Sequence, residues 1–174
     1  MKSQKAVFLD RDGVINEDNE YVGKVEDFIF VKGIFRALKK LQERGYKLFI
    51  ITNQSGIGRG YYTEEDYKEI TEYMLNEFEK NNITIEKVYF CKHTPEDNCN
   101  CRKPKPGMIL QASKEFNIDL KNSWVIGDKL SDVEAGENVG CKTILINSGY
   151  VKDSTRKKFK DLYEAGEFIL DNSR

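Results

Sequence analysis

Three aspartates and a threonine stand where short apolar runs of this sequence end. Asp10 and Asp12 follow one run in FLDRDG, and Thr52 closes a second in LFIITN. Asp128 follows a third run, in WVIGD. If these runs are parallel strands, their carboxyl ends meet at one edge of the sheet, where sites form in open α/β sheets. Crowded carboxylates repel one another unless a cation lies between them, so we expect Mg²⁺, a hard ion that prefers oxygen, at Asp10, Asp12 and Asp128.

A second group of reactive residues is confined to the stretch CKHTPEDNCNCRKPKPG, which begins at residue 91. It holds three of the four cysteines and the only histidine, spaced as C-x-H and C-x-C. Where thiols stay reduced, such clustering indicates a metal rather than a disulfide. Three thiolates and an imidazole form a closed tetrahedral zinc site that is structural, not catalytic. The expected zinc ligands, in a loop over 91–105, are Cys91, His93, Cys99 and Cys101.

Five short runs rich in β-branched and aromatic residues are expected to be the strands that position these groups. They cover 5–10, 46–53, 87–91, 123–128 and 142–147. Expected helices start near Ile34, at Thr63 with Asp66 in a capping box, near Pro106, and at Ser131 with Glu134 in another. The tail is expected to be helical from Ser154 to Gly166, with a short edge strand from Glu167 to Leu170. Alternating strands and helices predict an α/β fold with a mainly parallel sheet and helices on both faces.

Length and composition limit the class of protein. A chain of 174 residues fits one domain, 1–174, and 39% hydrophobic with 33% charged residues is typical of a soluble globular protein. No apolar run approaches the roughly 18 residues of a membrane span, and the first run is too short for a signal peptide. We therefore expect a cytoplasmic protein. The net charge of −1 excludes a global basic field that would hold nucleic acid.

Four segments resemble the motifs of the haloacid-dehalogenase-like (HAD) phosphatases, in order and in spacing: FLDRDGVIN, ITNQSG, RKPKPG and GDKLSD. The resemblance runs from about residue 5 to residue 149 and implies a single Rossmann-like HAD domain that transfers phosphoryl groups through an aspartyl-phosphate. Asp10 would be the nucleophile beside Mg²⁺. Asp12 would be the general acid and then the base, and only its backbone carbonyl would touch the metal.

Further roles follow from the same resemblance. Thr52 and the backbone amides around Asn53 would hold phosphoryl oxygens, while Gly13 would let backbone N–H groups face the phosphate. Asp132 would either support the metal site or serve only in the first turn of a helix. Lys103 is expected to balance charge between Asp10 and the phosphoryl group, with Lys105 as the alternative.

The zinc loop is expected to act as a clamp. Arg102 and Lys103 follow the last expected ligand directly. A displacement of about an ångström can cost roughly a hundredfold in rate, so anchoring this cationic pair with zinc would matter for catalysis. Arg102 would grip a second anionic group bidentately.

The expected zinc loop also indicates which family of HAD phosphatases the sequence resembles. CxH…CxCRKPKPGM together with DRDGVIN, TNQSG and GDKLSD looks like the D-glycero-D-manno-heptose-1,7-bisphosphate 7-phosphatases, related to the histidinol-phosphate phosphatases. This implies removal of the 7-phosphate on the route to nucleotide-activated heptose for a bacterial cell surface, such as lipopolysaccharide. A bisphosphate would account for the additional cations at Arg102 and Lys129. The implied substrate contacts are Arg11, Asp18, Tyr21, Asn53, Gln54, Ser55, Arg102 and Lys129.

Other functions stay open at this point. Histidinol phosphate is one alternative substrate, although its amine would favour carboxylates, and a nucleic-acid 3′-phosphate end is another. A zinc-stabilised binding module without catalysis is a third alternative, although every motif carboxylate is present. About forty residues separate Asp12 from Thr52, which leaves no room for a large cap, so loops 18–23, 54–61 and 92–105 must enclose the substrate. We expect a monomer whose partner is a small phosphorylated sugar, with no nucleic acid and no membrane.

Overall fold

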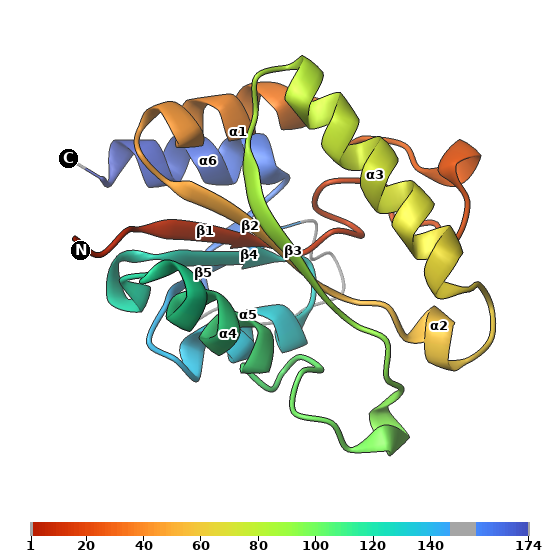
Figure 1. Ribbon diagram of the computed structural model, residues 1–174. Helices are drawn as coiled ribbons and strands as arrows, with labels where there is room; N and C mark the ends of the chain where they lie inside the picture. Colours follow the sequence, from red (N-terminus) through yellow and green to blue (C-terminus); the bar gives the residue numbers. More distant parts are fainter. Residues whose placement is uncertain (1, 147–155, 174) are drawn as a thin grey trace.

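The computed structural model describes residues 2–146 and 156–173 and contains a six-stranded sheet in the order β3-β2-β1-β4-β5-β6 (Figure 1). All neighbouring strands run parallel. The strands are β1 Ala6–Leu9, β2 Lys47–Asn53, β3 Ile85–Cys91, β4 Trp124–Gly127, β5 Lys142–Ile146 and β6 Lys158–Phe159. The first five confirm the predicted strands to within two residues at each end, and residue 147 of the fifth lies outside the described residues. Because β1 lies between β2 and β4, their carboxyl ends bring Asp10, Thr52 and Asp128 to one edge.

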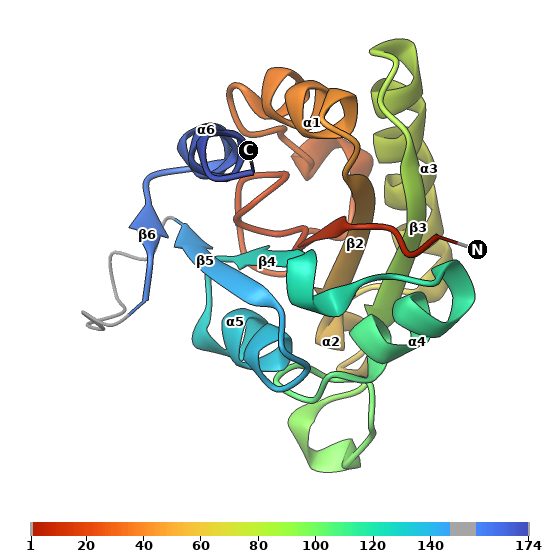
Figure 2. The same cartoon turned by 90° about the vertical axis from the view of Figure 1, so that its left-hand side faces the viewer.

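Helices cover both faces of this sheet, as predicted (Figure 2). They are α1 Ile34–Glu43, α2 Ser55–Gly58, α3 Glu64–Lys80, α4 Gly107–Phe116, α5 Leu130–Glu137 and α6 Leu162–Asp171, with short 3₁₀ turns at Val25–Asp27, Pro95–Asp97 and Leu120–Asn122. Helices α1, α3 and α6 pack on one face, whose core includes Val7 and Leu9 of β1. Helices α4 and α5 pack on the other, against Ala6 and Phe8. This alternation along β1 is the period-two pattern of a strand buried on both sides.

Helix α3 confirms its predicted start. Thr63 accepts a hydrogen bond from the Asp66 N–H at 3.1 Å, and Asp66 accepts from the Thr63 N–H at 2.8 Å. The predicted capping box at Ser131 and Glu134 is wrong, because α5 begins at Leu130 and Asp132 accepts from the Lys129 N–H at 3.1 Å. Asp132 thereby fixes the helix start at the end of the loop after β4.

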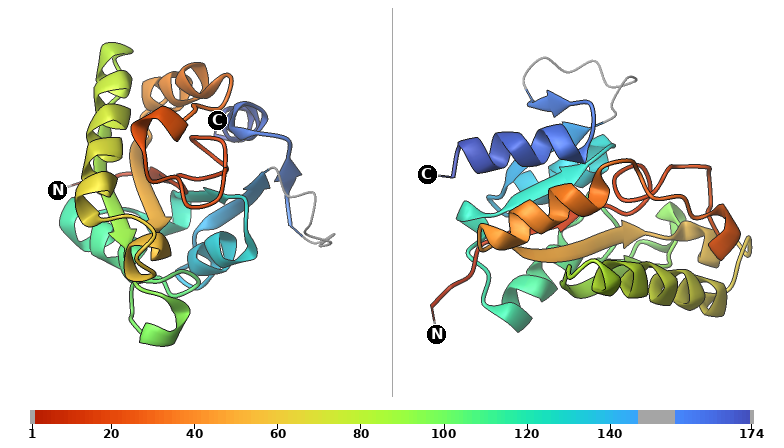
Figure 3. Two further views of the ribbon diagram at one scale, coloured as in Figure 1. Left: turned by 90° about the vertical axis from the view of Figure 1, so that its right-hand side faces the viewer. Right: turned by 90° about the horizontal axis from the view of Figure 1, so that it is seen from above.

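The tail reverses the predicted order of helix and strand. Strand β6 comes first and pairs with β5, and the predicted strand at 167–170 lies inside α6. Asp161 caps α6 by accepting from the Glu164 N–H at 3.0 Å, and apolar residues at helical spacing along α6 are buried. Figure 3 shows α6 beside α1 on the sheet. Residues 154 and 155 of the predicted helix lie outside the described residues.

Two further expectations concern what surrounds the sheet. Within 2–146 and 156–173 no large cap covers its carboxyl edge, which is left to loops and the short helix α2. None of the helices in those ranges combines the length and the apolar character needed to cross a bilayer.

Candidate active site

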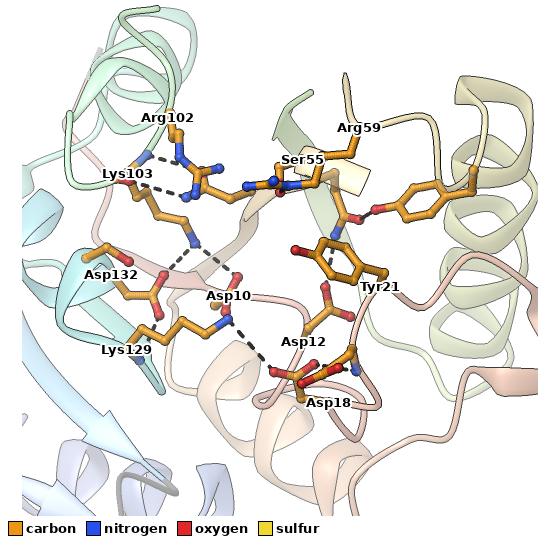
Figure 4. Close-up of a pocket in the computed structure, with 15 residues that line it drawn as sticks. Asp10, Asp12, Asp18, Tyr21, Ser55, Arg59, Arg102, Lys103, Lys129 and Asp132 are labelled. Atoms are coloured by element: carbon orange, nitrogen blue, oxygen red, sulfur yellow. Dashed lines mark hydrogen bonds and ion pairs between the residues drawn. The ribbon is translucent and has the colours of Figure 1, made fainter. Parts of the chain in front are cut away.

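A cavity of about 610 Å³ opens at the carboxyl edge of β1, β2 and β4 (Figure 4). Its size is that of a small-molecule site. Every residue predicted as catalytic or as a substrate contact lines it except Arg11 and Thr52. Four lining residues were not predicted to be part of the site: Glu20, Arg59, Tyr62 and Ser131. Glu20, Arg59 and Tyr62 lie in or beside the loops expected to enclose the substrate, and Ser131 lies in the motif GDKLSD.

Lys103 lies at the centre of the charges in this cavity. Its Nζ is 3.0 Å from Asp10 Oδ1 and 2.6 Å from Asp132 Oδ1, and it donates to the Ile51 carbonyl at 2.8 Å. Burial alone would lower the pKa of Lys103, but the charges of Asp10 and Asp132 raise it above its ordinary value, so the amine stays protonated. Lys105 instead donates to the Cys99 carbonyl at 2.7 Å, so Lys103 is the lysine that contacts Asp10.

The backbone of Lys103 is held by the neighbouring strand end. Asn53, the last residue of β2, accepts from the Lys103 N–H at 3.1 Å and donates to the Lys103 carbonyl at 3.3 Å. Arg102 is held from the zinc loop, because its guanidinium donates to the His93 carbonyl at 3.3 Å. Lys103 is thus anchored to the sheet and Arg102 to the loop.

Asp10 and Asp128 form the part of the site suited to a divalent cation. Oxygens of Asp10, Asp128 and Asp132 lie within 4.8 Å of one another. Burial, then the charge of Asp132, raises the pKa of Asp128 to about 6 and that of Asp10 well above its ordinary value. Asp128 Oδ1 is buried without a hydrogen-bond partner among the described residues. Both Asp132 oxygens are engaged, one by Lys103 and one by the Lys129 N–H, so Asp10 and Asp128 have the oxygens free for an ion.

Two glycines make room for this convergence. A Cβ on Gly13, whose φ is +88°, would come 2.1 Å from Asp128 Oδ2. A Cβ on Gly127 would come 2.2 Å from the Asp132 Cβ. A larger residue would therefore displace Asp128 if it replaced Gly13, and Asp132 if it replaced Gly127.

Asp12 is surrounded by hydrogen-bond donors. The Arg11 guanidinium donates to Oδ1 at 3.0 Å and to Oδ2 at 3.2 Å, Asn16 donates to Oδ1 at 2.9 Å, and Gln54 donates to Oδ2 at 3.0 Å. Arg11 is fully buried, so its predicted contact with substrate is wrong for the side chain. The charge of Arg11 is balanced by its neighbour Asp12 and does not reach the cavity.

Thr52 also differs from its predicted role. Its hydroxyl accepts from Gln54 Nε2 at 2.8 Å, and the residue is fully buried. Gln54 therefore covers Thr52, and the next residues of the loop, Asn53, Gln54 and Ser55, line the cavity in its place.

The rim of the cavity carries charge of both signs. Lys129 Nζ lies 3.8 Å from Asp18 Oδ2, across the mouth, and Arg59 and Arg102 approach from the other side (Figure 4). Tyr21, which is 48% exposed, stands beside them. The rim thus offers several cations outside the buried Lys103.

The predicted zinc ligands converge beside this rim. Their ligand atoms lie within 4.8 Å of one another, with Cys91 Sγ 3.5 Å from Cys99 Sγ and from His93 Nδ1, and Cys101 Sγ 3.4 Å from His93 Nδ1. Tetrahedral zinc with bonds of about 2.0–2.3 Å requires ligand separations of about 3.5–3.8 Å, which these pairs nearly match. Cys91 and Cys101, at 2.8 Å, would move apart around an ion. The four cysteines are free thiols, and Cys141 is buried in the core between α4, α5 and the sheet.

A parallel sheet with a lysine held between a carboxylate that follows β1 and one in the first turn of α5 is typical of the class of the HAD-like phosphatases. A family model described as HAD-hydrolase-like matches residues 100–172. The D-glycero-alpha-D-manno-heptose-1,7-bisphosphate 7-phosphatase of Campylobacter jejuni is 52% identical over 166 residues, 95% of each chain. The D-glycero-beta-D-manno-heptose-1,7-bisphosphate 7-phosphatase of Helicobacter pylori strain 26695 is 53% identical over 147 residues, 84% of this chain and 85% of that one.

A solved structure is similar over the whole fold. The D,D-heptose 1,7-bisphosphate phosphatase from B. bronchiseptica, in complex with magnesium and phosphate, superposes with a TM-score of 0.88 at 28% identity, over 97% of this chain and 99% of that one. The present chain belongs to this family of HAD phosphatases, the heptose-1,7-bisphosphate 7-phosphatases. It is therefore an enzyme that hydrolyses phosphate monoesters, which removes the alternative of a binding module without catalysis.

Proposed function

We propose that this enzyme removes the 7-phosphate of D-glycero-D-manno-heptose 1,7-bisphosphate through an aspartyl-phosphate on Asp10, in a reaction that needs Mg²⁺. The observation that carries the proposal is the pair of cationic regions in one cavity. Lys103 is buried against Asp10, where one phosphoryl group would react, while Arg59, Arg102 and Lys129 stand at the rim, where a second phosphate would stay. The names of the relatives support the same substrate.

In the first step, a carboxylate oxygen of Asp10 attacks phosphorus in line and the bond from phosphorus to the sugar oxygen breaks. The charge of Lys103 favours the ionised form of Asp10 and offsets the charge of the phosphoryl oxygens. Asp12 transfers its proton to the departing sugar oxygen, which leaves as an alcohol.

In the second step, Asp12, now a carboxylate, takes a proton from water while the water oxygen attacks the phosphorus of the aspartyl-phosphate. The bond from Asp10 to phosphorus breaks, releasing inorganic phosphate and restoring both carboxylates to their starting forms. The single residue Asp12 serves both steps because it gains in the second the proton that it lost in the first.

The magnesium ligands in this proposal are Asp10, Asp128 and the backbone carbonyl of Asp12. The unpartnered buried oxygen of Asp128 and the raised pKa values of Asp10 and Asp128 fit a site built for a cation. When bound, the ion supplies positive charge that lets an anionic nucleophile approach an anionic phosphoryl group. Zinc on the four ligands of loop 91–105 would have the separate, structural role of holding Arg102.

The substrate is tested by steady-state kinetics with both anomers of the heptose bisphosphate, histidinol phosphate and a 3′-phosphorylated oligonucleotide. Both anomers belong in the panel, because relatives of nearly equal identity are named for different ones. We expect the highest kcat/KM for a heptose bisphosphate, because histidinol phosphate has no second phosphate for Arg102 and Lys129 to bind. A preference for histidinol phosphate or the oligonucleotide would overturn the substrate assignment.

The covalent mechanism is tested with Asp10→Asn. The amide keeps the shape of the side chain but is no nucleophile, so phosphate release should fall by roughly 10⁴-fold or more. Activity of Asp10→Asn close to that of the wild type would overturn the aspartyl-phosphate.

A further inference from the structure

Gln54 has every hydrogen-bonding position of its side-chain amide occupied. Its Nε2 donates to Asp12 Oδ2 at 3.0 Å and to Thr52 Oγ1 at 2.8 Å. Its Oε1 accepts from Arg11 Nη2 at 3.4 Å and from the Tyr62 hydroxyl. The reverse orientation would place Oε1 against the Asp12 carboxylate and the amide N–H groups against a guanidinium. The surroundings therefore allow Gln54 one orientation, with its N–H toward Asp12.

Tyr62 contributes a neutral hydroxyl to this network and is closely packed. It lies against Gly56 of α2 and Gly23 of the loop after β1: a Cβ on Gly56 would come 2.2 Å from its Cε1, and a Cβ on Gly23 would come 2.9 Å from its Cβ. Burial raises the pKa of Tyr62 to about 12, so its hydroxyl keeps its proton near neutral pH. Because Gln54 Oε1 can only accept, the Tyr62 hydroxyl must be the donor.

This arrangement decides where a proton on Asp12 can go. The side chains that contact Asp12 in the described residues, Arg11, Asn16 and Gln54, all present N–H groups to it. A protonated Asp12 thus finds no acceptor in the protein at these contacts, and its O–H is left to face the cavity. If Gln54 turned over, its Oε1 would accept that proton and hold it away from the substrate.

We propose that Tyr62 is a positioning residue for proton transfer, which keeps the Gln54 amide turned so that the Asp12 proton is available only to the departing sugar oxygen. This inference rests on the proposed role of Asp12 as general acid. Tyr62 touches neither the reacting phosphorus nor the leaving group in this role. It acts through Gln54 alone.

The test is Tyr62→Phe, which removes the hydroxyl and keeps the ring between the two glycines. Two substrates are compared by kcat/KM, which reports the steps up to departure of the leaving group. A sugar alkoxide needs the Asp12 proton to leave, whereas nitrophenolate leaves without it. We expect kcat/KM to fall about tenfold for the heptose bisphosphate and less than about twofold for p-nitrophenyl phosphate, since general acid catalysis contributes only to the first.

Tyr89→Phe is the matched control for the loss of a buried tyrosine hydroxyl. Tyr89 lies in β3, is 5% exposed, and donates to Glu115 at 2.9 Å, away from the cavity. Its substitution should leave the ratio of the two kcat/KM values unchanged.

A double-mutant cycle shows whether Tyr62 acts through Gln54. Gln54→Met has no amide to orient, so adding Tyr62→Phe to it should leave the ratio of the two kcat/KM values within about twofold of that of Gln54→Met alone. The cycle also guards against a folding defect, because all variants are compared by a ratio within one preparation.

Three results would overturn the inference: no loss in Tyr62→Phe, an equal loss on both substrates, or a further change of the ratio in the Gln54→Met background. If the wild type prefers another alkyl phosphate, that substrate takes the place of the heptose bisphosphate in the ratio. The substrate assignment then fails by itself, and the role of Tyr62 is still decided.

Discussion

The two regions that supply cations to this cavity are built in opposite ways. Around Lys103 the charged groups are buried, with Asp10 6%, Lys103 3% and Asp132 2% exposed, and each is held by strand ends or a helix start. In the zinc loop none of residues 92–102 is buried, and three cysteines and a histidine converge in place of an apolar core. Packing and ion pairs fix the first region, whereas in the second four potential metal ligands take that place.

The contacts of Lys103 and Arg102 indicate that the two regions have different functions. Lys103 has three side-chain contacts that do not involve the loop: Asp10, Asp132 and the Ile51 carbonyl. Arg102 has its side-chain contact with the His93 carbonyl, inside the loop. Chemistry at Asp10 should therefore depend on the packed region, and capture of the second phosphate on the loop of the proposed zinc ligands.

The largest effect is expected from Lys103→Met, which breaks the packed region. Asp10 and Asp132 would stay buried without their cation, and breaking such a group costs about 3–5 kcal/mol of stability. We expect the rate to fall about 10³-fold, since the charge that offsets the phosphoryl oxygens is lost. Urea unfolding and kcat measure the two losses.

The control for this change is Lys105→Met, two residues further along. Lys105 is exposed, and its contacts are Asn98 and the Cys99 carbonyl. Its stability should stay within about 1 kcal/mol of the wild type. A Lys103→Met enzyme as stable and as active as Lys105→Met would contradict the picture of a packed, charge-balanced centre.

The next effect is expected from Cys99→Ser, which breaks the loop and leaves the sheet intact. Zinc content should drop, and kcat/KM should fall about a hundredfold as Arg102 loses its anchor. Because Lys103 keeps its own contacts, most of the loss should appear in KM and little in kcat. Elemental analysis and steady-state kinetics give both readouts.

Cys141→Ser is the control that distinguishes the loss of a metal ligand from the loss of a thiol elsewhere in the protein. Cys141 is 8% exposed and lies in the core between α4, α5 and the sheet, outside the cluster. It should keep its zinc and its KM. A Cys99→Ser enzyme that holds no zinc but has wild-type kinetics would refute the positional role of the loop.

The same contrast explains which features were predictable from sequence. The strands were predicted closely because a strand buried on both faces is a continuous apolar run, and the capping box at Thr63 is a local pattern. The convergence of the four proposed zinc ligands followed from their spacing within one short loop. In each case the information lies within a few residues of chain.

Features that depend on the direction of one side chain were not predictable. Arg11 resembled a substrate cation, but its guanidinium turns to Asp12 and is buried. Thr52 was expected to face the phosphate, but Gln54 covers it. The place of Tyr62 depends on two glycines, 23 and 56, that meet only in the fold. The tail was misassigned because its apolar residues fit a helix or a short strand, and packing on α1 decides between them.

A smaller effect, on stability, distinguishes the metal at the carboxylates from the metal in the loop. Burial and Asp132 raise the pKa of Asp128 to about 6 in the folded protein, whereas its pKa in the unfolded chain is about 4. Between these two values the folded protein therefore holds a proton that the unfolded chain has released. Stability from this group is present at about pH 4 and below, and is lost as pH rises through about 6. In EDTA at pH 7.5, Asp128→Asn should thus be more stable than the wild type by about 1–2 kcal/mol, a shift reduced for partial solvent exposure.

This gain should shrink as the pH falls and vanish well below about pH 4, where Asp128 is protonated in both states. Mg²⁺ should raise the stability of the wild type and leave Asp128→Asn almost unchanged, because binding to the folded state alone stabilises it. The control, Asp171→Asn at the exposed end of α6, should stay within about 0.5 kcal/mol of the wild type with or without the ion. Thermal unfolding in EDTA and in Mg²⁺ measures all three proteins. A wild type that Mg²⁺ fails to stabilise more than Asp128→Asn would show that these carboxylates are not where the ion binds.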